Sequence, residues 1–146
     1  MTTKIRQKPA ATLRFVMDAT PDAVLAAEAR IFRVARELGF CPKTCNELAR
    51  AVGELVLNAC TYAYGNDDGQ VAMEISSRDD LLEIIVLDNG RGFNCREYFL
   101  PDGSLGPRAQ PTMGLIRAAR LVDRFTIASG SQGTTVRMLK KVQQNE

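Results

Sequence analysis

The alternation of hydrophobic and polar positions predicts a strand and then a helix at the start of the chain. Apolar residues alternate with polar ones over 11–18, which is typical of a half-buried strand. A helix is predicted from Pro21 to about Leu38, because Thr20 precedes a proline suited to the first helical position and Gly39 suits the C-terminal cap. One broad side of this helix is apolar and is predicted to face the core: Val24, Leu25, Ala27, Ile31, Val34, Ala35 and Leu38.

A second helix is predicted from about Pro42–Thr44 to about Ala63. Its apolar stripe has spacings of four, three and four residues and predicts the face that packs on the core: Leu48, Val52, Leu55 and Ala59. An adjacent stripe carries Glu54 and Asn58. These two residues are one helical turn apart, so the carboxylate and the amide are expected to point the same way.

The rest of the chain predicts a sheet with one more helix and a long loop. The whole order is βααββαββ, which favours an α+β fold: a two-layer α/β sandwich with a mostly antiparallel sheet covered on one face by helices. Long loops in compact domains are commonly lids or binding loops. The predicted segments are strands over 70–77, 81–88, 124–128 and 134–139, a helix over about 113–121, and a loop over 93–113 that is rich in glycine and proline.

Length and composition favour one cytoplasmic domain that does not bind nucleic acid or membrane. The 146 residues predict a single domain over 1–146. No apolar run approaches the roughly 18 residues of a membrane span, and the basic segment 1–11 lacks the apolar stretch of an export signal. A net charge of +2, with no concentrated basic stripe, argues against a nucleic-acid partner.

Residue usage also restricts the chemistry. The chain has no histidine, which excludes Ser-His-Asp and Cys-His catalysis and a phosphohistidine on this chain. Its four cysteines include no CxxC pair and are expected to be reduced structural thiols. Carboxylates, amides or a bound metal must therefore carry any catalysis.

Three segments stand out, although each has an ordinary structural interpretation when taken alone. The segment from Glu54 to Asn58 could be the solvated edge of an amphipathic helix. The segment Asp88-Asn89-Gly90-Arg91-Gly92 could be a glycine turn after a strand, and Gly133-Thr134-Thr135 could be a hairpin corner.

In this order and at these distances, however, the segments resemble the nucleotide-binding boxes of the superfamily that includes histidine kinases, type II topoisomerases, MutL proteins and a heat-shock chaperone. The likeness is greatest to the stand-alone anti-sigma-factor serine/threonine kinases. It spans about Phe15 to Leu139, within a domain core of about 12–140. The resemblance implies a Bergerat-type ATP-binding fold with a lid over about 93–113. The matching boxes are Ala51-Val52-Gly53-Glu54-Leu55-Val56-Leu57-Asn58-Ala59, Leu87-Asp88-Asn89-Gly90-Arg91-Gly92-Phe93, Met113-Gly114-Leu115 and Gly133-Thr134-Thr135-Val136.

At the phosphate end, the resemblance implies that Asn58 helps to hold Mg²⁺ and that Glu54 is the catalytic general base. Magnesium prefers oxygen ligands and keeps several waters, which suits an amide oxygen beside phosphates. The third box departs from the family, because Gly114 is the glycine that remains where a GxGxGL-like run is expected. Arg108 is a further candidate for the γ-phosphate, with a solvated loop charge as its alternative.

At the adenine end, the resemblance implies that Asp88 accepts a hydrogen bond from the adenine amino group. Gly90 and Gly92 are expected to let the backbone pass close to the base and ribose. Thr135 is the hydroxyl expected nearest to the adenine. The implied ligands are therefore ATP or ADP with Mg²⁺.

The resemblance implies a bacterial, cytoplasmic homodimer that acts by partner switching in the regulation of transcription. Such a protein phosphorylates a STAS-type antagonist and sequesters a sigma factor. One alternative is a non-catalytic nucleotide-binding module that switches its partner by binding alone. Another is a detached histidine-kinase catalytic domain, which is disfavoured because the sequence shows no phosphoacceptor helices.

Overall fold

The computed structural model describes residues 11–64 and 68–142. Predictions made above for 1–10, 65–67 and 143–146 lie outside the described residues. The elements follow the predicted order βααββαββ: β1 (Ala11–Asp18), α1 (Pro21–Glu37), α2 (Pro42–Asn58), β2 (Gln70–Arg78), β3 (Leu81–Asp88), α3 (Gly114–Arg120), β4 (Arg124–Gly130) and β5 (Gly133–Lys141). A π-helical turn, Ala59–Ala63, extends α2, and a short 3₁₀ turn covers Cys95–Glu97.

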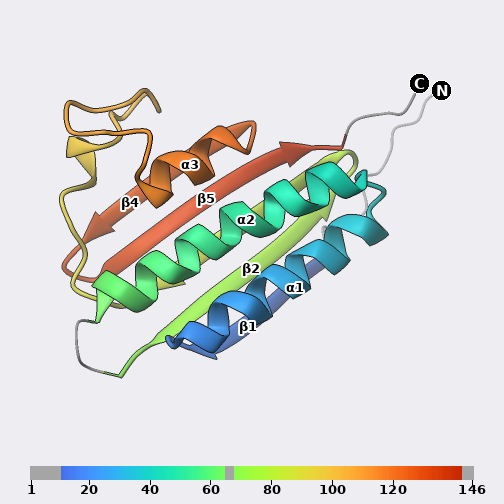
Figure 1. Cartoon of the computed structure of the whole chain (residues 1–146), viewed down its shortest axis with the longest axis horizontal. Coiled ribbons are helices and arrows are strands. Elements are labelled where there is room, and N and C mark those ends of the chain that lie inside the picture. Colours follow the sequence, from blue (N-terminus) through green and yellow to red (C-terminus); the bar gives the residue numbers. More distant parts are fainter. Residues whose placement is uncertain (1–10, 65–67, 143–146) are drawn as a thin grey trace.

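The fold has two layers, with the three helices on one face of a twisted sheet (Figure 1). The five strands lie in the order β1-β2-β3-β5-β4, and every neighbouring pair is antiparallel. The predicted α+β sandwich is confirmed, and the sheet is entirely antiparallel among the described strands. Helix α2 lies between α1 and α3 (Figure 1).

Helix α1 turns most of its predicted apolar side toward the core, because Val24, Val34 and Leu38 are partly buried against it. Its buried residues recur every four positions, at Ala23, Ala27, Ile31 and Ala35. Leu25 was expected on this side, but it is 69% exposed. The expectation was wrong because a position two residues from both Ala23 and Ala27 lies on the far side of a helix with 3.6 residues per turn.

Helix α2 buries the predicted stripe and also its flanks, because it has a helix on each side. Leu48, Val52, Leu55 and Ala59 are all buried. Ala51 and Gly53 are buried as well. The predicted continuation to Ala63 is present as the π-helical turn, a geometry that occurs frequently at functional sites.

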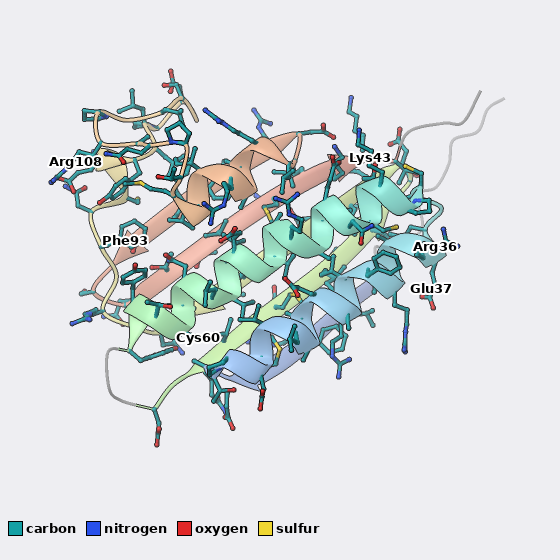
Figure 2. All side chains as sticks on the ribbon, viewed as in Figure 1. Arg36, Glu37, Lys43, Cys60, Phe93 and Arg108 are labelled. Atoms are coloured by element: carbon teal, nitrogen blue, oxygen red, sulfur yellow. The ribbon has the colours of Figure 1, made fainter. Side chains whose placement is uncertain are left out.

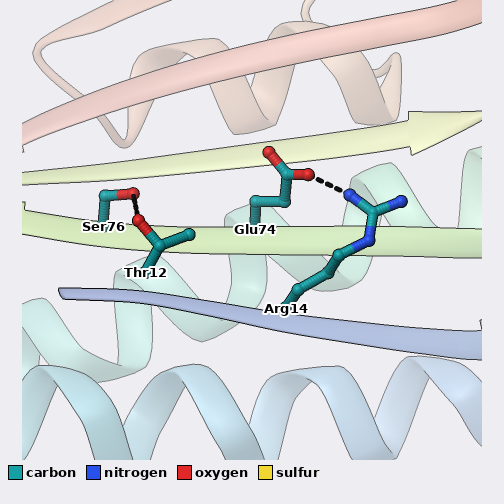
Figure 3. A network of polar contacts seen from close by, with 4 residues as sticks. All are labelled: Thr12, Arg14, Glu74 and Ser76. Carbon is teal, nitrogen blue, oxygen red and sulfur yellow. Dashed lines mark hydrogen bonds and ion pairs between the residues drawn. The ribbon is translucent and has the colours of Figure 1, made fainter.

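The other face of the sheet carries polar pairs and half-buried apolar residues, and no described helix covers it. Arg14 pairs with Glu74 across β1 and β2, and the Thr12 and Ser76 hydroxyl oxygens are 3.1 Å apart (Figure 3). On β2, Glu74 and Ser76 alternate with the buried Met73 and Ile75, as strand geometry requires.

The segment between β3 and α3 is a loop, as predicted, and it is fixed to β4. The backbone N–H of Gly106 donates to the Tyr98 carbonyl at 2.8 Å, which closes the loop on itself. Phe99 is 5% exposed, and its ring stacks on Phe125 of β4 with 4.8 Å between ring centroids. The loop therefore has one anchored side next to the sheet edge.

Candidate functional site

A cavity of about 650 Å³ opens between the C-terminal end of α2, the end of β3, the loop and the start of α3. This volume lies within the range of small-molecule sites, roughly 300–1,000 Å³. The residues that line it are Asn58, Tyr62, Ala63, Asp88, Arg91, Gly92, Phe93, Tyr98, Thr112, Met113, Gly114, Leu115, Ile116 and Thr134. Figure 2 shows Phe93 at this end of the molecule, between the loop and the sheet.

Asp88 supplies a half-buried carboxylate at the end of β3. One of its oxygens accepts the backbone N–H of Gly90 at 2.9 Å. Burial raises the pKa of this carboxyl, and the backbone N–H groups of Gly90 and Thr134 oppose that rise. A hydrogen-bond acceptor held in this way inside an apolar cavity is suited to recognise a donor on a ligand.

Gly90 and Gly92 are required by the packing of the protein itself. A Cβ at Gly90 would lie 2.3 Å from the Ala63 carbonyl oxygen, and one at Gly92 would lie 2.0 Å from the Gly130 carbonyl oxygen. Gly92 also has φ of +71°, which L-residues rarely adopt. Gly92 lines the cavity, whereas Gly90 packs behind it against Ala63. From the sequence, both glycines were expected to allow the close passage of a base and ribose.

The hydroxyl at this end of the cavity belongs to Thr134 and not to Thr135. Thr134 is 8% exposed, and its Oγ1 is 2.7 Å from the Ser129 Oγ, which accepts the Phe93 N–H at 2.9 Å. Thr135 is exposed on the opposite face of β5. Strand alternation explains the difference, because Thr134 shares the parity of the buried Val136 and Met138.

Asn58 and Glu54 lie one turn apart on α2, as predicted, but they have different surroundings. The Asn58 side chain lines the cavity. The Glu54 carboxylate is not among the lining groups and instead accepts a hydrogen bond from Arg117 Nε at 2.9 Å. Asn58 offers an amide oxygen of the kind that Mg²⁺ accepts when phosphates and waters complete its shell.

The third box forms one wall of the cavity. Thr112, Met113 and Gly114 all line it, and α3 begins at Gly114. Arg108 lies outside the cavity, at the outer edge of the loop (Figure 2). Its side chain is 68% exposed, and its guanidinium is 3.6 Å from the Glu97 carboxylate. This position agrees with the alternative that Arg108 is a solvated charge on the loop.

Comparison with known proteins agrees with this geometry. Residues 17–140 match the model of the histidine kinase-like ATPase domain. The chain belongs to this family. It is 32% identical over 134 residues to the serine-protein kinase RsbW of Bacillus pumilus, covering 84% of this chain and 80% of that protein. It is 28% identical over 129 residues to RsbW of Bacillus subtilis, with the same coverage of both chains.

A solved structure supports the same fold. The crystal structure of the RsbU and RsbW domains of a Mycobacterium tuberculosis protein matches 94% of this chain with a TM-score of 0.66 and 23% sequence identity. The match covers 34% of the chain in that crystal structure. The curated relatives are serine-protein kinases, and with the family match they confirm the resemblance to anti-sigma-factor serine kinases. No helix among the described residues is long and apolar enough to cross a membrane.

Several residues at or beside the cavity of this histidine kinase-like ATPase domain were not predicted from the sequence. Tyr62 follows Asn58 by one helical turn, and Arg91 donates from Nε to the Tyr62 carbonyl at 3.2 Å. Helical spacing alone could have found Tyr62. Arg117 had no comparable signal, since an arginine on a short helix usually belongs to a solvated face.

Proposed function

We propose that this protein is a serine/threonine-protein kinase that uses Mg-ATP to phosphorylate a STAS-domain antagonist. We also propose that the protein sequesters a sigma factor while the antagonist is absent or phosphorylated. The observation that carries the proposal is that Asn58 and Asp88, from two separate elements, line one cavity whose wall includes Gly114. The names of its relatives, serine-protein kinases, support the same activity.

The nucleotide is expected to lie along the cavity with its adenine at Asp88 and its phosphates toward Asn58. Asp88 presents an acceptor for the adenine amino group, and the Thr134 hydroxyl lies on the same side of the sheet. The Asn58 amide oxygen is the proposed protein ligand to Mg²⁺, and Thr112 to Gly114 border the phosphate end. When bound there, Mg²⁺ would neutralise charge at the phosphates.

Glu54 is the proposed general base. The serine hydroxyl of the antagonist gives its proton to the Glu54 carboxylate while its oxygen bonds to the γ-phosphorus. The bond between that phosphorus and the β–γ bridging oxygen breaks, and ADP leaves. Base assistance of this kind contributes roughly 10²–10⁴-fold to rates.

The protein is further proposed to act as a homodimer in the bacterial cytoplasm. The sheet face opposite the helices supports this, because Ile85, Leu87 and Leu139 are only half-buried there and no described helix covers them. Light scattering on the purified protein tests the oligomeric state. A monomer at micromolar concentration would contradict the dimer and leave the kinase proposal intact.

Phosphotransfer is the experiment that tests the proposed activity. The purified protein is incubated with radiolabelled Mg-ATP and, one at a time, with the STAS-domain proteins of its bacterium. Acid-stable phosphate on a serine or threonine of one of them is the expected result. Nucleotide binding and partner binding without transfer would favour the non-catalytic module, and acid-labile phosphohistidine on a partner would favour the histidine-kinase alternative.

A further inference from the structure

Arg117 joins the proposed general base to the segment that precedes α3. Its Nε donates to Glu54 Oε2 at 2.9 Å, and one of its terminal nitrogens donates to the Thr112 carbonyl oxygen. The guanidinium therefore bridges α2 and the end of the loop. A planar guanidinium can make two such contacts at once in a fixed geometry, which a lysine ammonium cannot do in the same way.

Gly114 confines the same carboxylate from its other side. A Cβ placed on Gly114 would lie 2.5 Å from Glu54 Oε1 and 3.4 Å from its carboxyl carbon. Among the residues that the structure describes, Arg117 is the ion-pair partner of Glu54, and it engages Oε2. One carboxylate oxygen is thus held, while the other lies beside the first residue of α3, a residue that lines the cavity.

The exposure of the two side chains argues that this pair orients groups more than it stabilises the fold. The Glu54 side chain is 21% exposed and that of Arg117 is 44% exposed. Ion pairs this close to solvent contribute little to folding stability. Glu54 raises the pKa of Arg117 further above its already high value, so the guanidinium remains charged and the pair persists wherever Glu54 is ionised.

We propose that Arg117 is a positioning residue that holds Glu54 by Oε2, so that Oε1 is the oxygen that accepts the serine proton. Gly114 provides the space in which Oε1 can do so. The contact with Thr112 makes the position of the base depend on the end of the loop. This inference rests on the proposed kinase function and adds a residue to it.

The test compares single-turnover phosphotransfer, at saturating Mg-ATP, to the STAS-domain protein that the wild type phosphorylates. Arg117→Ala is expected to slow transfer by about 10- to 100-fold, the scale for a reacting group displaced by about 1 Å. Its Mg-ATP affinity and its melting temperature are expected to stay at the wild-type values. Arg117→Lys is expected to recover part of the rate, because it restores the charge without the second contact.

Arg120→Ala is the matched control, because Arg120 is exposed in the last turn of the same helix. It is expected to transfer phosphate at the wild-type rate. The decisive variant is Glu54→Gln with Arg117→Ala. If Arg117 acts through Glu54, adding the Arg117 change to Glu54→Gln causes no further loss.

Two results would overturn the inference while the proposed function stands. One is wild-type transfer by Arg117→Ala. The other is a full additional loss in the Glu54→Gln background, which would mean that Arg117 acts on the substrate independently of Glu54. If the wild type transfers no phosphate to any STAS-domain protein, the proposed function itself fails, and the inference fails with it.

Discussion

Replacing Asp88 by asparagine tests the adenine end of the cavity. The substitution keeps the shape of the side chain, and the new amide oxygen can still accept the Gly90 N–H that Asp88 accepts at 2.9 Å. The other carboxylate oxygen becomes an NH₂ donor, which faces the donor group of the adenine. Leaving such a buried polar group mismatched costs about 1–3 kcal/mol. Mg-ADP affinity is therefore expected to fall by about 5- to 150-fold.

Titration calorimetry with Mg-ADP measures this loss, and Asp80→Asn provides the matched control. Asp80 is exposed in the turn before β3, at the opposite end of the strand from Asp88. The same chemical change there is expected to leave affinity unaltered. Equal affinities for wild type and Asp88→Asn would refute the assignment of Asp88 to the adenine.

A second prediction concerns how the stability of Asp88→Asn depends on pH. Burial raises the pKa of Asp88 in the folded protein, so the ionised carboxylate is disfavoured by folding. Its folding cost is absent below the unfolded-state pKa, grows as the pH rises from there to the folded-state pKa, and is constant at higher pH. Without nucleotide, Asp88→Asn is expected to be more stable than the wild type at neutral pH. Urea unfolding at several pH values should show this advantage disappear in acid, and an advantage independent of pH would contradict the linkage.

Two further predictions concern the loop and its ends. Gly92→Ala is expected to destabilise the protein by more than Gly103→Ala in urea unfolding, because both residues have positive φ but a Cβ at Gly92 meets the Gly130 carbonyl whereas one at Gly103 meets nothing within 4 Å. Equal losses would show that backbone strain alone matters. The proposed antagonist, when unphosphorylated, is expected to bind this protein with affinities that differ roughly 5- to 150-fold between ADP and ATP, the range of a typical coupling. Shortening the loop between Tyr98 and Ala109 should reduce that ratio. The same affinity with both nucleotides would contradict a nucleotide-driven switch.

The sequence predicts those parts of the fold in which buried residues recur at the spacing of a helix or a strand. The stripe from Leu48 to Ala59 is buried because its spacing matches one face of a helix. The strand over 81–88 was predicted from a short apolar run that a polar link precedes, and the structure buries alternate residues of β3. The same rule, applied strictly, would have chosen Thr134 over Thr135 and left Leu25 outside the core.

The features that sequence did not predict depend on contacts between elements. The π-helical turn after Asn58 has no sequence pattern of its own, and its last residue, Ala63, packs directly against Gly90. The pairing of Arg117 with Glu54 joins residues 63 positions apart in the chain. No local spacing reveals such a pair.

We propose that the cavity serves phosphotransfer with Glu54 as the general base. Glu54→Gln tests it most directly, when Mg-ATP affinity and transfer to the serine of the antagonist are measured on the same preparation. We predict wild-type affinity and transfer slowed by roughly a hundredfold or more, the scale for removing a general base. Transfer at the wild-type rate by Glu54→Gln would contradict the claim.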